Sequence, residues 1–145
     1  MDAIVLMPGE GERIGGASAI TIKATGDGTA GSMYLGEGVL EAGFPGPPPH
    51  VHDRLHDMFY VLEGTLTLRL GDDTVELPAG GFACVPPGVV HTFANTGDAP
   101  IRILNFNTPA GWEHYMRDLA EVLSSGDPTP ERIGAVAARY DFRPV

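Results

Sequence analysis

The clearest chemical signal in this sequence lies between Pro47 and Gly64, where two histidines stand one residue apart. His50 and His52 follow three consecutive prolines, which keep the chain extended and make a helix unfavourable here. Because successive side chains of a β-strand point to opposite faces, the two imidazoles can face the same way. Two imidazoles at this spacing can share one metal ion from a single strand.

Two motifs of the chain resemble the paired motifs of the cupin superfamily. The first motif has the pattern G-x5-H-x-H-x3 or x4-E-x6-G. This chain matches it at His50, His52 and Gly64, has Asp57 where glutamate is usual, and has its upstream glycine out of position. Every position of the second motif, G-x5-P-x-G-x2-H-x3-N, is matched by Gly80, Pro86, Gly88, His91 and Asn95. The two motifs occur in order and are separated by a short predicted hairpin, residues 65–79.

The resemblance extends to the C-terminal part of the chain. The stretch from Asn95 to Leu123 looks like the tail of small single-domain cupins that are described as quercetin 2,3-dioxygenase-like. The resemblance implies an all-β cupin jelly-roll (double-stranded β-helix) barrel at about residues 19–108, with short C-terminal helices at about 110–140. It also implies one divalent transition metal per chain, Fe, Mn, Ni, Co or Zn, with His50, His52 and His91 as ligands.

The fourth ligand is Asp57, His56 or water. On an uninterrupted strand His56 would share the face of the two paired histidines, and Asp57 would face away. The six-residue gap to the closing glycine of the motif favours Asp57, because Asp57, Phe59 and Val61 would then point inward together. If it does not bind the metal, the shorter aspartate is free to act as the catalytic base.

The ligand set and the resemblance together predict a metal-dependent enzyme that acts on a small molecule. The leading hypothesis is a dioxygenase-type oxidoreductase that binds an enolate or hydroxy-ketone and then O2. Phe59 and Phe93 share faces with Asp57 and His91, so they would line the cavity and favour an aromatic or polyketide-like substrate, unless they are plain barrel core. The alternatives are an isomerase, cyclase or lyase that uses the metal as a Lewis acid, and a non-catalytic small-molecule-binding protein.

The elements that must position these residues can be read from periodicity. The chain has 20 glycines and 13 prolines, and many short alternating runs between turns predict an antiparallel sandwich or jelly roll. Strands are expected at 19–24, 32–40, 58–62, 65–70, 74–77, 82–85, 91–95 and 101–107. After Pro109 the apolar period becomes helical, which predicts a helix with its stripe packed on the barrel. A second helix is predicted to begin with Thr129 as N-cap and Pro130 as its first residue.

Composition bounds the remaining properties. The length of 145 residues predicts a single domain, residues 1–145, and the formal net charge of −10 argues against nucleic acid or anionic membranes as partners. The single cysteine, Cys84, excludes an intramolecular disulfide and is expected to be a buried thiol. The start lacks the features of a signal peptide, so a cytoplasmic location is expected. The resemblance implies a homodimer, with which an exposed edge strand at Ile4 to Met7 is compatible.

Overall fold

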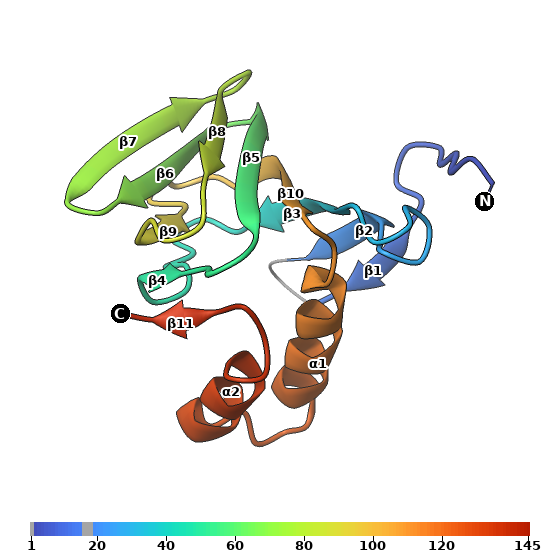
Figure 1. The fold of residues 1–145 in the computed structure, drawn as a ribbon. Helices are drawn as coiled ribbons and strands as arrows, with labels where there is room; N and C mark the ends of the chain where they lie inside the picture. The colour runs from blue at the N-terminus through green and yellow to red at the C-terminus, as the bar shows by residue number, and fades with distance from the viewer. Residues whose placement is uncertain (1, 16–18) are drawn as a thin grey trace.

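The computed structural model describes residues 2–15 and 19–145 of the chain (Figure 1). Its strands and helices, in chain order, are β1 (Glu12–Ile14), β2 (Ile20–Ala24), β3 (Tyr34–Leu40), β4 (His50–Val51), β5 (His56–Glu63), β6 (Thr65–Leu70), β7 (Asp73–Pro78), β8 (Phe82–Val85), β9 (His91–Ala94), β10 (Ile101–Thr108), α1 (Trp112–Ser124), α2 (Pro130–Ala137) and β11 (Arg143–Pro144). The strands expected from periodicity, at residues 19–24 and from 32 to 107, all appear within a few residues of their predicted bounds.

The strands form two antiparallel sheets. One has the order β1-β2-β3-β10-β5-β8 and the other the order β11-β4-β9-β6-β7. Strand β10 lies between β3 and β5, and β9 lies between β4 and β6. Strands from late in the sequence are therefore inserted between strands from earlier in it. This arrangement is the jelly roll that was expected, and the prediction of an all-β fold with short C-terminal helices is confirmed.

The main core fills the space between the sheets. Strand β5 shows how the sequence builds it, because Asp57, Phe59 and Val61 are buried while His56 and Tyr60 are exposed. Strand β6 of the other sheet alternates in the same way and buries one of its sides, as a pleated strand allows. The other buried apolar side chains of this core are Leu40, Leu66, Leu68, Val85, Ile101 and Ile103.

The two helices build a second core at one end of the jelly roll (Figure 1). Its buried residues are Tyr115 on α1, Val136 and Ala137 on α2, and Phe142 just before β11. The apolar stripe of α1 was expected to pack on the barrel, but it packs mainly on α2 and the C-terminal segment. Helix α2 begins as predicted, with the Thr129 side chain accepting a hydrogen bond of 3.2 Å from the backbone of the first turn.

Two expectations about the surface are wrong. Residues Ile4 to Met7 form no strand and are exposed, and the six-stranded sheet is bordered by β1, which pairs with β2, and by β8. Cys84 is exposed on β8, because the alternation of that strand turns Ala83 and Val85 inward and leaves Cys84 outside. Among the described residues, no helix is both long and apolar enough to cross a membrane.

Candidate metal centre

The structure brings three histidines and one aspartate to a single point inside the jelly roll. His50 lies on β4, His52 directly after it, Asp57 on β5 and His91 on β9, and their ligand atoms all lie within 4.8 Å of one another. Their side chains are buried, with 1% to 5% of each residue exposed. His56 is exposed and lies outside this cluster. The four residues expected from the motifs therefore share one interior point, and His56 does not.

Local chain geometry explains why Asp57 rather than His56 turns inward. The extended conformation of β4 does not continue into β5, because the chain bends at Asp53 and Arg54 between the two strands. The bend interrupts the two-residue alternation that would have placed His56 on the face of the paired histidines. Strand β4 also pairs with β9, and this register sets His50 directly opposite His91.

Each histidine ring of the cluster is oriented by a hydrogen bond from its outer nitrogen. Nδ1 of His50 and Nδ1 of His91 each bond the carbonyl oxygen two residues earlier, at 2.9 and 3.0 Å. Nδ1 of His52 bonds the carbonyl oxygen of Asp141, at 2.5 Å. Because a carbonyl can only accept, all three Nδ1 atoms carry the hydrogen, and the Nε2 atoms are left with lone pairs. This is the tautomer in which Nε2 ligates a metal.

The inner atoms of the cluster lack the protons that would satisfy them. Nε2 of His91 lies 3.0 Å from Oδ2 of Asp57, and both are acceptors once Nδ1 carries the hydrogen of the neutral ring. Nε2 of His52 lies 3.4 Å from the same oxygen, but it is buried and has no hydrogen-bond partner. An extra proton or a metal cation between these atoms would complete their interactions. The donor set of three imidazoles and one carboxylate fits a divalent transition metal.

Two asparagines of β10 hold the Asp57 carboxylate from the other side. The side-chain amides of Asn105 and Asn107 each donate to Oδ1 of Asp57 at 2.7 Å, and Asn107 lies opposite Asp57 in the strand register. Burial by itself would raise the pKa of Asp57, but in the metal-free protein a proton between Oδ2 and the imidazoles of His52 and His91, together with the Asn105 amide, outweighs burial and lowers the pKa to about 2. Asp57 therefore stays ionised, with Oδ1 anchored and Oδ2 facing the histidines.

The surroundings shift the pKa values of the two paired histidines in opposite directions. Burial, the largest cause, lowers the pKa of His50 to about 4, so this ring is neutral near pH 7. Burial also acts to lower the pKa of His52, but the Asp57 carboxylate and the Asp141 carbonyl together raise it. A neutral imidazole is the form that binds a metal.

Several residues that surround the cluster were not identified from the sequence. The ring of Phe142 stacks on His50 with centroids 4.3 Å apart, and Trp112 meets His52 edge-on at 5.2 Å. The two-residue spacing of Asn105 and Asn107 indicates only that they share one face of β10; the pairing of β10 with β5, which sets Asn107 beside Asp57, is not recorded in that spacing. Phe142 and Trp112 have no such local signal, since their contacts depend on how the helical end packs.

Two other expected residues have clear places in the fold. Phe59 is fully buried in the core, and its ring lies 5.2 Å from that of the half-buried Phe93. Asn95, the last residue of the second motif, donates to the carbonyl oxygens of Leu40, Glu41 and Ala99 at 2.8 to 3.1 Å. Asn95 therefore has a structural role in strand and turn contacts, and the predicted substrate contacts of Phe59 and Phe93 stay a prediction.

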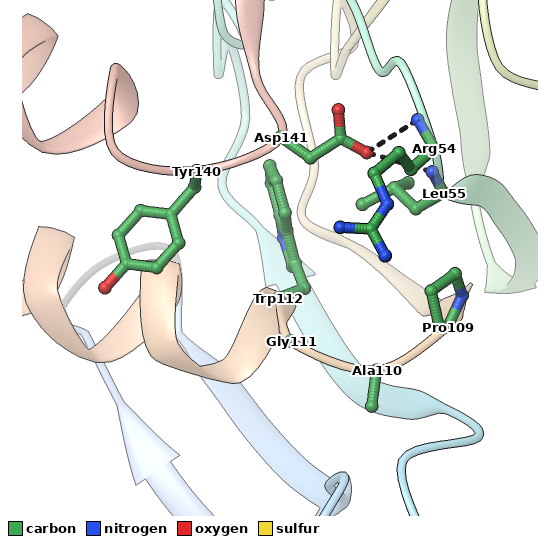
Figure 2. A pocket seen from close by; sticks show the side chains of 8 residues that line it. All are labelled: Arg54, Leu55, Pro109, Ala110, Gly111, Trp112, Tyr140 and Asp141. Carbon is green, nitrogen blue, oxygen red and sulfur yellow. Dashed lines mark hydrogen bonds between the residues drawn. The ribbon is translucent and has the colours of Figure 1, made fainter.

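A small pocket is lined in part by Trp112 and Asp141 (Figure 2), two residues that also contact His52. Arg54 and Tyr140 also line this pocket. Its volume is about 130 Å³, below the roughly 300–1,000 Å³ of sites that enclose drug-sized ligands. The pocket by itself accommodates only a small molecule. Its remaining lining residues are Leu55, Pro109, Ala110 and Gly111.

The fold and the cluster define a class of protein, a jelly roll with a candidate site for one metal ion. Residues 36–107 match the cupin domain family. The chain belongs to the cupin superfamily, which confirms the resemblance seen in the motifs.

Comparison with individual proteins gives a range of relatives. Quercetin 2,3-dioxygenase of Bacillus subtilis is 37% identical over 92 residues, which are 61% of this chain and 26% of that protein. The chain spans between 26% and 56% of the length of the curated relatives it matches. A crystal structure of an RmlC-like cupin from Shewanella frigidimarina shares the fold, with a TM-score of 0.64 at 20% identity over 78% of this chain and 96% of that one. A sugar phosphate isomerase of the cupin superfamily from Silicibacter pomeroyi is 26% identical, with a TM-score of 0.53 over 61% of this chain and 59% of that one.

Proposed function

We propose that this protein is a metal-dependent cupin enzyme of the dioxygenase type, an oxidoreductase that acts on a small aromatic or polyketide-like molecule. The observation that carries this proposal is the buried cluster of His50, His52, Asp57 and His91, with three Nε2 atoms and one carboxylate oxygen around one point. The sequence similarity to a quercetin 2,3-dioxygenase supports the choice of reaction. In such a site a bound divalent metal supplies Lewis acidity and, when it is iron, electron transfer with O2.

In this proposal Asp57 acts as the fourth ligand rather than as the catalytic base. Oδ1 of its carboxylate accepts from the amides of Asn105 and Asn107, and Oδ2 faces the Nε2 atoms of the histidines, in position to ligate a metal together with them. A carboxyl group with a pKa of about 2 is also a weak proton acceptor near neutral pH. The two amides fix Oδ1, which leaves Oδ2 of this shorter side chain turned toward the histidines.

The chain's own residues would also control the surroundings of the reaction. Trp112 and Phe142 cover the paired histidines with aromatic rings, which would limit the access of water to the site. Phe59 and Phe93 are the proposed contacts for the apolar part of the substrate.

The test is the metal content of untagged protein, measured by elemental analysis on the wild type and on His50→Ala, Asp57→Ala and His56→Ala. We expect about one metal per chain in the wild type and loss of the metal in the first two variants. His56→Ala is the matched control, because this exposed histidine precedes Asp57 without joining the cluster. Absence of metal from the wild type after reconstitution with Fe(II), Mn(II), Ni(II), Co(II) and Zn(II) would refute the proposal.

A second candidate function is isomerisation without redox chemistry at the same site. It is favoured by the similarity to the cupin sugar phosphate isomerase, the solved structure at 26% identity. Oxygen uptake by the Fe(II) form with flavonols and diketones supports the dioxygenase. Activity that persists without oxygen in the Zn(II) form supports the isomerase. We also propose that the protein is a homodimer, which sedimentation analysis would establish.

A further inference from the structure

One histidine of the cluster depends on the C-terminal end of the chain for its orientation. His50 and His91 donate their Nδ1 hydrogen bonds to carbonyl groups two residues away, within their own segments. His52 bonds instead to the carbonyl of Asp141, which lies 89 residues later in the sequence. The first two rings are therefore set by local structure, and the third is set by tertiary structure.

The side chain of Asp141 holds the loop that follows His52. Its carboxylate accepts hydrogen bonds from the backbone N–H groups of Asp53, Arg54 and Leu55 at 2.6, 3.0 and 2.9 Å. Figure 2 shows the bonds to the last two of these residues. Burial acts to raise the pKa of Asp141, but the three amides outweigh it and lower the pKa, so the carboxylate is charged. Asp141 thus bonds both the imidazole of His52 and the loop that leads from His52 to Asp57.

The surrounding structure keeps Asp141 in this place. Phe142 is buried in the second core and stacks on His50. Strand β11 then pairs with β4, which sets Arg143 opposite Val51, and the N–H of Val145 bonds the carbonyl of Pro49 at 3.0 Å. The residues on the C-terminal side of Asp141 are therefore bonded to the strand that carries the first histidine.

We propose that Asp141 is a positioning residue of the metal centre, which fixes the ring of His52 through its carbonyl and the loop to Asp57 through its carboxylate. This inference rests on the proposed metal site. Disturbing the outer partner of a metal ligand costs about 10-fold to 100-fold in metal affinity. Side-chain variants of Asp141 keep the backbone carbonyl, so they act on His52 by releasing the loop that the carboxylate holds. Asp141→Ala removes all three loop bonds, whereas Asp141→Asn keeps one carbonyl oxygen as an acceptor. We expect metal affinity to fall in the order wild type, Asp141→Asn, Asp141→Ala.

The experiment compares Zn(II) affinity, measured by competition with a chromophoric chelator, in the wild type and both Asp141 variants. The matched control is Asp118→Asn, because Asp118 bonds the hydroxyl of Tyr140, one residue before Asp141, but does not contact His52 or its loop. We expect the control to keep wild-type affinity. The visible spectrum of the Co(II) form should also change in the Asp141 variants, since it reports the coordination of the ion.

A second readout needs no metal. Long-range ¹⁵N–¹H NMR correlations of the histidine side chains should show a hydrogen on Nδ1 of His52 in the wild type, and its resonance should shift in Asp141→Asn and Asp141→Ala. If the wild type binds Zn(II) and the Asp141 variants bind it equally well with unchanged His52 resonances, this inference fails while the metal site stands. If the wild type binds no metal, the proposed function fails first. Should Asp141→Ala not fold, Asp141→Asn decides the outcome.

Discussion

Removing the amide of Asn107 should weaken metal binding far more than it weakens the metal-free fold. Asn107 donates to Oδ1 of Asp57 at 2.7 Å, and a hydrogen bond to a charged group contributes about 1.5–3 kcal/mol. Its other polar atom, Oδ1, is buried without a partner, at a cost of roughly 1–3 kcal/mol. Asn107→Ala removes both effects. We therefore expect the free energy of unfolding of the metal-free protein to change by no more than about 1–2 kcal/mol.

The metal-bound protein should respond differently, because Asp57 loses one of the two donors that orient it. An outer partner of a ligand affects affinity by about 10-fold to 100-fold, which corresponds to about 1.4–2.8 kcal/mol at 1.4 kcal/mol for each factor of ten. In excess Zn(II) the stability of the wild type should exceed that of Asn107→Ala by this additional amount. The assay is urea unfolding in chelator and in Zn(II), together with a Zn(II) competition titration.

The control for this prediction is Asn95→Ala. Asn95 is as buried as Asn107, with 1% exposed, and it bonds three carbonyl groups away from the cluster. Its replacement should lower the free energy of unfolding by about 1 kcal/mol for each of the three lost hydrogen bonds. The affinity of the folded protein for Zn(II) should not change. The reasoning is refuted if Asn107→Ala behaves like this control, losing several kcal/mol of metal-free stability while its affinity for Zn(II) stays at the wild-type value.

Two further predictions concern the fold around the site. Glu113 accepts from the N–H groups of Gly26 and Gly111 at 2.8 and 2.9 Å, and although burial acts to raise its pKa, these backbone bonds lower it below 4.5. Its contribution to stability is therefore present above pH 4.5 and is lost as the pH falls through the lower folded pKa. The stability gap between wild type and Glu113→Gln, about 1–2 kcal/mol at pH 7, should close on acidification in urea titrations; a gap that is constant with pH would contradict this. In Gly46→Ala, with φ of 76°, the new Cβ would lie 1.7 Å from the carbonyl oxygen of Phe93, so the variant should not fold to the native state. Gly43→Ala has a similar φ but open space and should lose only about 1–2 kcal/mol; equal stability of the two variants in urea unfolding would contradict the argument.

Much of the fold and most of the cluster follow from local patterns. The six-residue gap before the closing glycine favoured an inward face for Asp57, Phe59 and Val61 over one with His56, and the structure buries these three residues. The change to a helical period after Pro109 predicted α1, and Thr129 with Pro130 predicted the start of α2. Patterns failed where the environment decides, as at Cys84, whose apolar neighbours suggested burial although the outer face of β8 is exposed.

The sequence by itself determined the spacing of the histidines, the strands that carry them and the helical end of the chain. These properties depend on neighbours a few residues apart, and the periods of strands and helices report such neighbours directly. Only the tertiary structure decided that Asn107 anchors Asp57 across 50 residues and that Asp141 orients His52 across 89 residues. Contacts at that separation arise from the packing of whole elements, as when α1, α2 and β11 bring the end of the chain against β4. No local period records them, because each partner is set by a different part of the fold.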